Sequence, residues 1–302
     1  MEQFDMDKSR ILRRVGWALF LMVLSNLASQ LILEDISSRY LPGFYQSEYY
    51  MVGVVLLSVI GVGYPVFLAV IRKVPDSKCS QESPAKLTVR QFIGLFFVCV
   101  AFMYLASIIG SFIIYLFSNL KGREVRNPVE SFIKASNIYL NVLYTVVIGP
   151  IMEEFIFRKV LLNKVRRFGD RPAIIFTGIA FGLYHLNLSQ FLYAATLGII
   201  FSYTAIRTNT IKYTIIIHMI LNAIGTMIAP YALKNTSIML LLSLWLIVSI
   251  VVGLVIFVRN RRCILLEEGA EKTEKKSEYY LHTGTLLYIL LCIFMMVYQI
   301  VY

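Results

Sequence analysis

Residues 149–158, which read GPIMEEFIFR, decide the fold of this chain. Two adjacent carboxylates, Glu153 and Glu154, and one guanidinium, Arg158, lie within a mostly apolar segment that covers residues 138–162. A run of this length and composition predicts a helix that spans a membrane. An ionisable side chain costs at least ~2.5 kcal/mol at that depth, so such groups are rare there and are usually paired or functional.

Helical spacing gives the two glutamates different environments. Glu154 and Arg158 are four residues apart on one face, with the acid N-terminal to the base, which is the better order for an ion pair. Glu153 projects about 100° away and has no such partner on its own helix. We therefore expect a structural Glu154–Arg158 pair and a Glu153 that is free for chemistry. Gly149 and Pro150 predict a helix start or kink, which would put Glu153 in the first turn near a positive dipole end.

The composition predicts an all-α fold, a polytopic membrane helix bundle that forms a single domain over residues 1–302. Of the 302 residues, 58% are hydrophobic, and no pattern of alternating ten-residue strands typical of a membrane barrel occurs. We expect about eight core transmembrane helices and a ninth at the C-terminus. Residues 138–258 would form the catalytic core, 259–283 a charged cytosolic segment and 284–302 the extra span. The nine apolar segments cover residues 12–33, 50–71, 91–118, 138–162, 172–187, 188–206, 213–229, 238–258 and 284–302.

The formal net charge of +11 is arranged as in a membrane protein. Lysines and arginines concentrate in alternate loops, which predicts a multi-pass protein of the cell membrane with a cytosolic N-terminus and an external C-terminus. No basic stripe interleaved with aromatic residues occurs, so we expect no nucleic-acid partner. The four cysteines are scattered, without a CxxC pair, and predict neither a disulfide framework nor a metal site. The predicted cytosolic segments are residues 8–14, 72–90, 164–171, 207–212 and 259–276.

Two of the three histidines lie in predicted spans. Gly178, Gly182 and His185 share one helical face, and the two glycines would let another helix approach closely. His218 and Asn222 are one turn apart on a later span. An isolated histidine or asparagine in a membrane is often only a hydrogen-bonded packing residue. Three successive polar-bearing elements together with Glu153 instead favour a shared functional interior.

Other membrane chemistries lack their sequence signatures. The zinc-protease motif HExxH, the nucleophile elbow GxSxG and an aspartate within a span are all absent from the sequence. A transporter would usually show repeated halves or paired broken helices, and neither is evident. A catalytically silent immunity or scaffold protein would keep the fold and tolerate loss of Glu153. The residues favour chemistry based on glutamate and histidine and leave these two alternatives open.

At these residues the chain resembles the CPBP family (CAAX protease and bacteriocin-processing, also called Abi) of intramembrane proteases. The three motifs of that family, EExxxR, FxxxH and HxxxN/D, each lie on a membrane helix. Here they are Glu153–Arg158, Phe181–His185 and His218–Asn222, in order and in separate spans. Pro150 also fits the pattern. Lys159 departs from it, because the family usually has glycine after the arginine.

The resemblance implies an intramembrane endopeptidase that hydrolyses a peptide bond in a membrane-associated peptide or protein. The substrate would be CAAX-like, or a bacterial peptide or leader, as in bacteriocin processing and self-immunity. Glu153 and His185 would activate a water, and His218 and Asn222 would stabilise the oxyanion. No cofactor is required by this scheme, although a zinc ion held by Glu153, His185 and His218 is an open alternative. The supporting residues would be Glu154, Arg158 and Phe181.

Overall fold

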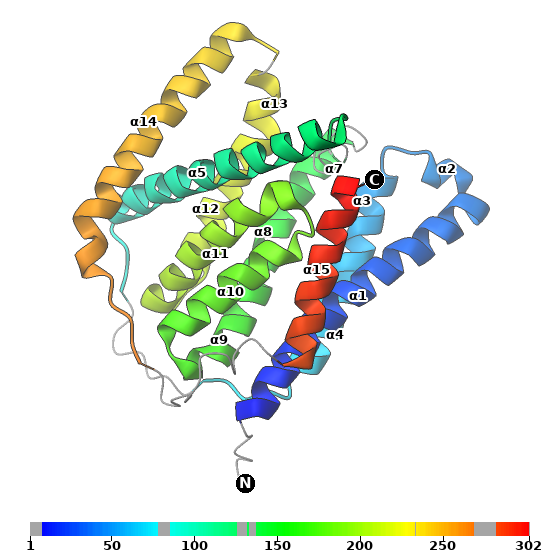
Figure 1. Ribbon diagram of the computed structural model, residues 1–302, viewed down its shortest axis with the longest axis horizontal. Helices are drawn as coiled ribbons and strands as arrows, with labels where there is room; N and C mark the ends of the chain where they lie inside the picture. Colours follow the sequence, from blue (N-terminus) through cyan, green and yellow to red (C-terminus); the bar gives the residue numbers. More distant parts are fainter. Residues whose placement is uncertain are drawn as a thin grey trace.

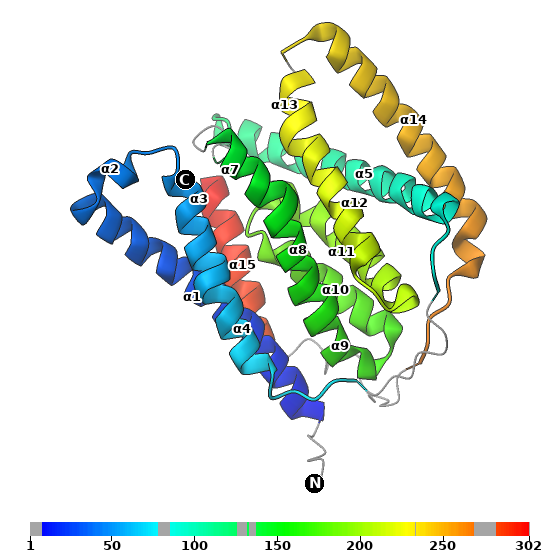
Figure 2. The ribbon, with the colours of Figure 1, turned by 180° about the vertical axis from the view of Figure 1, so that it is seen from behind.

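The computed structural model describes residues 8–77, 85–125, 132, 137–232, 234–268 and 282–301, which form a bundle of long helices (Figures 1 and 2). Within these ranges no strand occurs, and the only isolated β-bridge joins Gly169 to Glu268. All nine predicted apolar segments are helical along most of their length. Among the described residues, seven helical segments are long and apolar enough to cross a membrane. The predicted polytopic helical bundle is thus confirmed.

The helices that precede the motif-bearing segment are α1 (Lys8–Tyr40), α2 (Pro42–Tyr45), α3 (Tyr50–Val55), η1 (Leu56–Gly63), α4 (Tyr64–Ile71) and α5 (Val89–Lys121). The first motif lies on a rod composed of α7 (Ile138–Val142), η2 (Leu143–Ile148), α8 (Gly149–Glu154), η3 (Phe155–Leu161), α9 (Leu162–Val165) and η4 (Arg166–Phe168). The later helices are α10 (Asp170–Tyr184), α11 (Leu188–Thr208), α12 (Lys212–Ala223), η5 (Ile224–Ile228), α13 (Ala229–Ala232), α14 (Thr236–Asn260), η6 (Arg261–Cys263) and α15 (Thr283–Val301).

Two of the nine predicted spans are shorter than the others. α10 has 15 residues, and α12 with η5 forms a short apolar helix over Lys212–Ile228. These two carry the second and third motifs, and they lie in the middle of the bundle between α5 and α14 on one side and α1, α4 and α15 on the other (Figures 1 and 2). α10 and α12 each keep an exposed apolar face, at Ile179 and at Ile216 and Ile220, whereas their motif residues Phe181 and His218 are buried inside the bundle.

Small residues allow α10 and α11 to approach closely. A Cβ atom added to Gly182 would lie 2.7 Å from the Cβ atom of Ala195, and one added to Gly198 would lie 2.8 Å from the Cα atom of Gly178. Neither position has room for a side chain. The close helix approach predicted from Gly178 and Gly182 is confirmed, and it fixes the orientation of the helix that carries Phe181.

The rod from α7 to η4 differs from the sequence expectation at Gly149 and Pro150. Gly149 has helical backbone angles (φ −54°, ψ −60°), and its N–H donates to the Tyr144 carbonyl five residues earlier. The chain thus passes from a π-helical stretch into an α-helical one without starting a new helix. The prediction that Glu153 lies in a first turn is wrong, because the local π register accommodates Pro150 inside a continuous rod.

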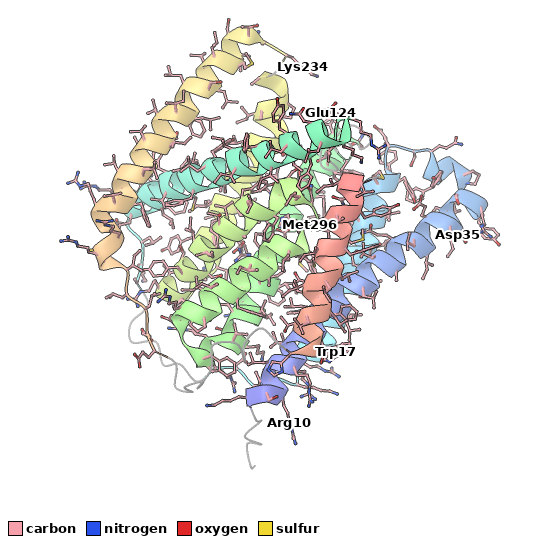
Figure 3. The ribbon with its side chains drawn as sticks, in the orientation of Figure 1. Arg10, Trp17, Asp35, Glu124, Lys234 and Met296 are labelled. Atoms are coloured by element: carbon pink, nitrogen blue, oxygen red, sulfur yellow. The ribbon has the colours of Figure 1, made fainter. Side chains whose placement is uncertain are left out.

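Polar segments meet at one end of the bundle, as the alternating charge pattern predicted. Backbone hydrogen bonds there join Ser77 to Asn163, Ala85 to Arg207 and Asp170 to Glu267, and the Arg167 side chain donates to the Pro75 carbonyl. Figure 3 shows Arg10 and Trp17 near this end, whereas Glu124 and Lys234 lie towards the opposite one. Residues 269–281 of the predicted charged segment, Cys79 and Tyr302 lie outside the described residues. Cys99, Cys263 and Cys292 are free thiols.

The ninth predicted span, α15, packs between α1 and α10. Gly284 contacts α1 so closely that an added Cβ would collide with the Trp17 amide nitrogen. Tyr288 is buried and donates a 2.6 Å hydrogen bond to the Ala180 carbonyl of α10. α15 therefore braces the helix that carries the second motif.

Candidate active site

The first and third motifs meet at a buried cluster of charged and polar side chains. Glu154 is 0% exposed and Arg158 is 2% exposed. The Arg158 Nη1 atom lies 3.2 Å from Glu154 Oε1, which is the predicted i,i+4 ion pair. His218 from α12 also reaches this carboxylate, with its Nδ1 atom 3.1 Å from the same oxygen. Because a carboxylate only accepts hydrogen bonds, Nδ1 of His218 carries the hydrogen.

Glu153 lies on the opposite side of the His218 ring. Its Oε2 atom is 3.7 Å from the Nε2 atom of His218, and its side chain is 17% exposed. This distance is too long for a direct hydrogen bond. A proton-bearing group such as a water can hydrogen-bond to both atoms when placed beside them. The glutamate that the sequence left unpaired is thus partly accessible and faces an imidazole from another helix.

Phe181 connects the three motifs at the centre of the cluster. The Arg158 guanidinium carbon lies 4.0 Å from the centroid of the Phe181 ring, a favourable cation–π distance. The same ring packs edge-on against His185 and His218, with centroid distances of 4.9 and 5.9 Å. The predicted supporting residues Glu154, Arg158 and Phe181 therefore form one contact network with both histidines.

His185 follows the last turn of α10 instead of lying within the helix. Its Nδ1 atom is 2.9 Å from the Phe181 carbonyl oxygen, which can only accept a hydrogen bond. Nδ1 is thus the protonated nitrogen, and Nε2 presents its lone pair away from the helix. The ring lies within electrostatic range of Glu153 and His218. An imidazole in this state can accept a hydrogen bond from a water.

Asn222 contacts the motif-bearing rod one helical turn from His218. Its Nδ2 atom donates a 2.7 Å hydrogen bond to the Thr145 carbonyl in η2. In the π register this carbonyl would accept from the backbone nitrogen of Pro150, which has no hydrogen. The proline therefore leaves an acceptor that the Asn222 side chain satisfies. One N–H of the Asn222 amide remains for another partner.

Four tyrosines that were not identified from the sequence interact electrostatically with Glu153. They are Tyr64, Tyr144, Tyr184 and Tyr193. The Tyr184 hydroxyl donates a 3.2 Å hydrogen bond to the Tyr64 hydroxyl, whose own hydrogen is then free to donate elsewhere. Only the position of Tyr184 next to His185 could have suggested it. Tyr64 belongs to α4, far from any motif in the sequence.

A zinc site needs several donor side chains close enough to share one ion. Both histidines present unprotonated Nε2 atoms, which suits zinc in chemical type. Across the described part of the chain, however, no three histidine, cysteine, aspartate or glutamate side chains are grouped closely enough to share an ion. The arrangement of Glu153, His185 and His218 therefore does not fit a three-ligand zinc site as it stands.

The segment that carries the three motifs is similar to a known protein family. Residues 135–224 match the family model described as Type II CAAX prenyl endopeptidase Rce1-like. This segment contains all three motifs and the rod from η2 to η4. The predicted resemblance to CAAX proteases is confirmed. Lys159 lies within the matched residues, so the departure at that position does not prevent the match.

Two curated proteins also resemble parts of the chain. One is "Putative membrane peptidase YdiL" of Bacillus subtilis (strain 168), 26% identical over 176 residues, or 56% of this chain and 69% of that protein. The other is "Membrane-embedded CAAX protease MroQ" of Staphylococcus aureus (strain USA300), 31% identical over 129 residues, or 38% of this chain and 51% of that protein. No solved structure matches the chain. These likenesses support a membrane protease.

Proposed function

We propose that this protein is an intramembrane endopeptidase that hydrolyses a peptide bond in a membrane-associated peptide or protein. One observation carries the proposal: His218 lies between Glu153 and Glu154, 3.7 Å from the first carboxylate and 3.1 Å from the second. A histidine fixed by one buried acid beside a second, accessible acid can take part in proton transfer. The similarity to CAAX proteases supports the same class of reaction.

In the proposed reaction, Glu153 is the general base. It accepts a proton from a water while the water oxygen attacks the scissile carbonyl carbon, which gives a tetrahedral intermediate. His185 accepts a hydrogen bond through Nε2 and orients the water. Glu153 then delivers the proton to the leaving nitrogen as the C–N bond breaks, so that one water is consumed and a carboxylic acid and an amine are formed.

His218 and Asn222 have different requirements as oxyanion stabilisers. The Nδ1–H group of His218 is occupied by Glu154, so this residue can donate to an oxyanion only through Nε2 and only as imidazolium. Asn222 can donate through its remaining N–H while it keeps the bond to Thr145. Glu154 and Arg158 hold His218 in position, which is a supporting role.

The proposed substrate is a small peptide or a peptide segment at the membrane, either CAAX-like or a bacterial leader or bacteriocin-type peptide. We also propose that the end where residues 75–77, 163–170 and 264–268 meet is cytosolic, because it collects the basic loops. Reporter fusions should place residues 72–90 and 259–268 in the cytosol and Tyr302 outside. A cytosolic reporter at Tyr302 would contradict this orientation.

Replacement of Glu153 tests the proposed function. Glu153→Gln should lower turnover about 10²–10⁴-fold, while the amount of protein in the membrane stays near that of wild type. Peptide mass spectrometry of membranes and medium would compare the two strains. Glu124→Gln is the matched control, because it removes an exposed carboxylate at the other end of the bundle. Wild-type peptide profiles for Glu153→Gln would favour a catalytically silent immunity or scaffold protein.

Elemental analysis decides between the two catalytic schemes. In the glutamate scheme, active purified protein contains no stoichiometric metal and keeps its turnover after chelation. In a zinc scheme, one zinc per chain is lost together with activity and restored by re-addition, and His185→Ala and His218→Ala both abolish binding of the metal. The second result would overturn the proposed role of Glu153 as a metal-free base.

A further inference from the structure

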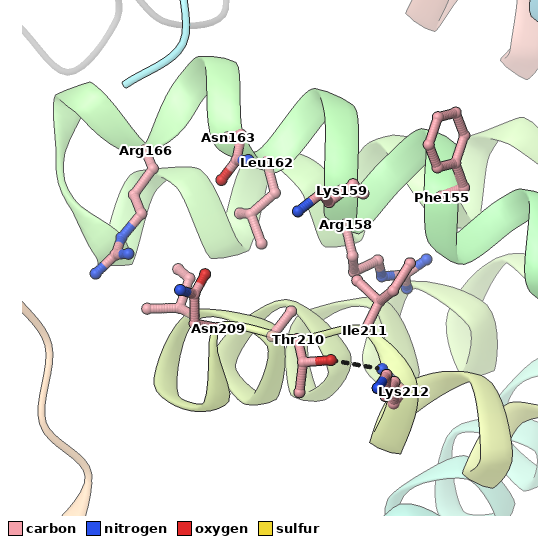
Figure 4. A pocket seen from close by; sticks show the side chains of 12 residues that line it. Phe155, Arg158, Lys159, Leu162, Asn163, Arg166, Asn209, Thr210, Ile211 and Lys212 are labelled. Atoms are coloured by element: carbon pink, nitrogen blue, oxygen red, sulfur yellow. Dashed lines mark hydrogen bonds between the residues drawn. The ribbon is translucent and has the colours of Figure 1, made fainter. Parts of the chain in front are cut away.

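A cavity of about 270 Å³ lies below the candidate active site, at the end of the bundle where the basic loops meet. One wall is the rod segment that carries Phe155, Lys159 and Asn163, and the opposite wall is the turn from α11 to α12 (Figure 4). Phe155 and Leu162 make part of the lining apolar. We call this cavity the basic pocket.

Four cationic side chains and no carboxylate line the basic pocket. Arg158 is balanced by Glu154, and Arg166 is balanced by Asp170 and Glu267. The other two cations, Lys159 and Lys212, are exposed and form no ion pair with any residue in the described ranges. The pocket therefore has two positive charges that its own walls leave uncompensated.

The lining also holds polar groups that can form hydrogen bonds. Arg158 contributes charge to the pocket and no contact, because its three guanidinium nitrogens are fully buried. The Thr210 hydroxyl accepts a hydrogen bond from the Lys212 backbone (Figure 4), which fixes the lip of the pocket. Asn163 and Asn209 add two side-chain amides to the lining. Cations and amide donors around a small cavity suit an oxyanion with several acceptor atoms.

The pocket lies between the two elements that carry the candidate catalytic groups. Lys159 belongs to η3, directly after the helix that bears Glu153 and Glu154, whereas Lys212 begins the helix that bears His218. An anion that contacts both lysines would join these two elements at their basic end. The pocket thus links one half of the candidate site to the other.

We propose that the basic pocket binds the phosphate group of an anionic phospholipid. Basic pockets between membrane helices near the surface bind acidic lipid headgroups, and the apolar wall of Phe155 and Leu162 can accommodate the glycerol and first acyl carbons. A dissolved phosphate has the same oxyanion chemistry but makes no use of that wall. The lipid contacts Lys159 and Lys212 together and thereby stabilises the contact between η3 and α12.

Lipid titration tests this inference independently of proteolysis. The purified protein would be placed in phosphatidylcholine nanodiscs with increasing phosphatidylglycerol, and its melting temperature and its retained lipid would be measured by thermal unfolding and native mass spectrometry. Phosphatidylglycerol should raise the melting temperature of wild type. The double variant Lys159→Gln with Lys212→Gln should bind it roughly 30-fold more weakly.

Matched variants separate a specific site from general surface charge. Lys73→Gln with Lys86→Gln removes two exposed lysines at the same end that do not line the pocket, and should keep wild-type affinity. Lys159→Arg with Lys212→Arg should also keep it. Equal weakening in both glutamine double variants, or unchanged affinity at the pocket, would overturn the proposal. Equal stabilisation by inorganic phosphate in phosphatidylcholine alone would overturn the lipid as the source of the phosphate group.

Discussion

Two buried arginines of the same rod, Arg158 and Arg166, pair with carboxylates and differ in how their partners are satisfied. Arg158 and Glu154 have fully buried side chains and face each other at 3.2 Å, but the three guanidinium nitrogens and Glu154 Oε2 make no hydrogen bond. Arg166 lies 2.9 Å from Asp170, and the second oxygen of Asp170 accepts a 3.0 Å hydrogen bond from the Glu267 backbone. The same i,i+4 spacing thus gives one incompletely satisfied pair and one satisfied pair.

The difference follows from what surrounds each pair. Aromatic rings and His218 surround Arg158, so its charge is balanced by one carboxylate and by the face of Phe181. Arg166 lies at the polar end, where the loop after α14 supplies backbone groups and a second carboxylate. A pair whose polar atoms are all hydrogen-bonded typically has a structural role. A buried pair whose carboxylate also binds a third group can hold that group in position. We infer that the first pair positions His218 and the second fixes the end of the rod.

Arg158→Ala should have the largest effect on stability. It leaves Glu154 as a buried carboxylate without its cation, which costs ~3–5 kcal/mol. The expected result is a strong loss of protein from the membrane, measured by quantitative immunoblotting and by thermal unfolding in detergent. Arg259→Ala, at an exposed position, is the control. Wild-type abundance for Arg158→Ala would contradict the structural role of the pair, as would an abundant and fully active Glu154→Ala.

Replacing both partners at once separates stability from positioning. Glu154→Leu combined with Arg158→Met removes both buried charges, so abundance should recover to near wild type. Turnover should still fall roughly 100-fold or more, because His218 loses the acceptor that fixes its protonated nitrogen. The ratio of turnover to protein amount is the measurement. Full activity per molecule in this variant would show that Glu154 does not orient His218.

Arg166→Ala should cost less than Arg158→Ala, about 1–3 kcal/mol. Asp170 keeps its hydrogen bond from the Glu267 backbone and lies in the first turn of α10, where a negative charge is favourable. Thermal unfolding of the two alanine variants side by side is the test, with the exposed Arg171→Ala as the control. An equal or larger loss for Arg166→Ala would reverse the comparison.

Glu267→Gln should have the smallest effect, about 0–1 kcal/mol. Its carboxylate is 52% exposed and lies 3.4 Å from Arg166 and 3.6 Å from Arg207, so salt should screen both contacts. The backbone bond to Asp170 is unaffected by this change. Unfolding at low and high salt should therefore show a small difference that disappears at high salt. A large loss that persists at high salt would mean that this carboxylate also has a structural role.

The sequence predicted what depends on local spacing and on apolar length. The Glu154–Arg158 pair follows from a four-residue separation, and the nine helical segments follow from nine apolar runs. The close approach of α10 and α11 follows from Gly178 and Gly182. Each of these features is determined by residues within one segment, so a single sequence contains the necessary information.

Contacts between segments were beyond such reasoning. Nothing in the spacing of His218 indicates that its Nδ1 atom reaches Glu154, since motif order does not tell which helix faces meet. The π register that keeps Pro150 inside the rod depends on packing around η2, and so the expected helix start was wrong. Tyr64 comes within reach of Glu153 only because its ring stacks on Tyr184 of α10, a contact between distant segments. The catalytic roles of Glu153, His185, His218 and Asn222 remain predictions.

The contact of α15 with α1 has a consequence for the order in which the molecule is completed. Gly16 and Gly284 meet across nearly the whole chain length, and Tyr288 reaches back to Ala180. During synthesis the contact between α1 and α15 can therefore form only after α15 has been inserted into the bilayer. Contacts between such distant residues form late. If synthesis stops before residue 283, the surface of α1 around Gly16 stays uncovered. We expect that unfinished chain to be recognised by quality-control proteases.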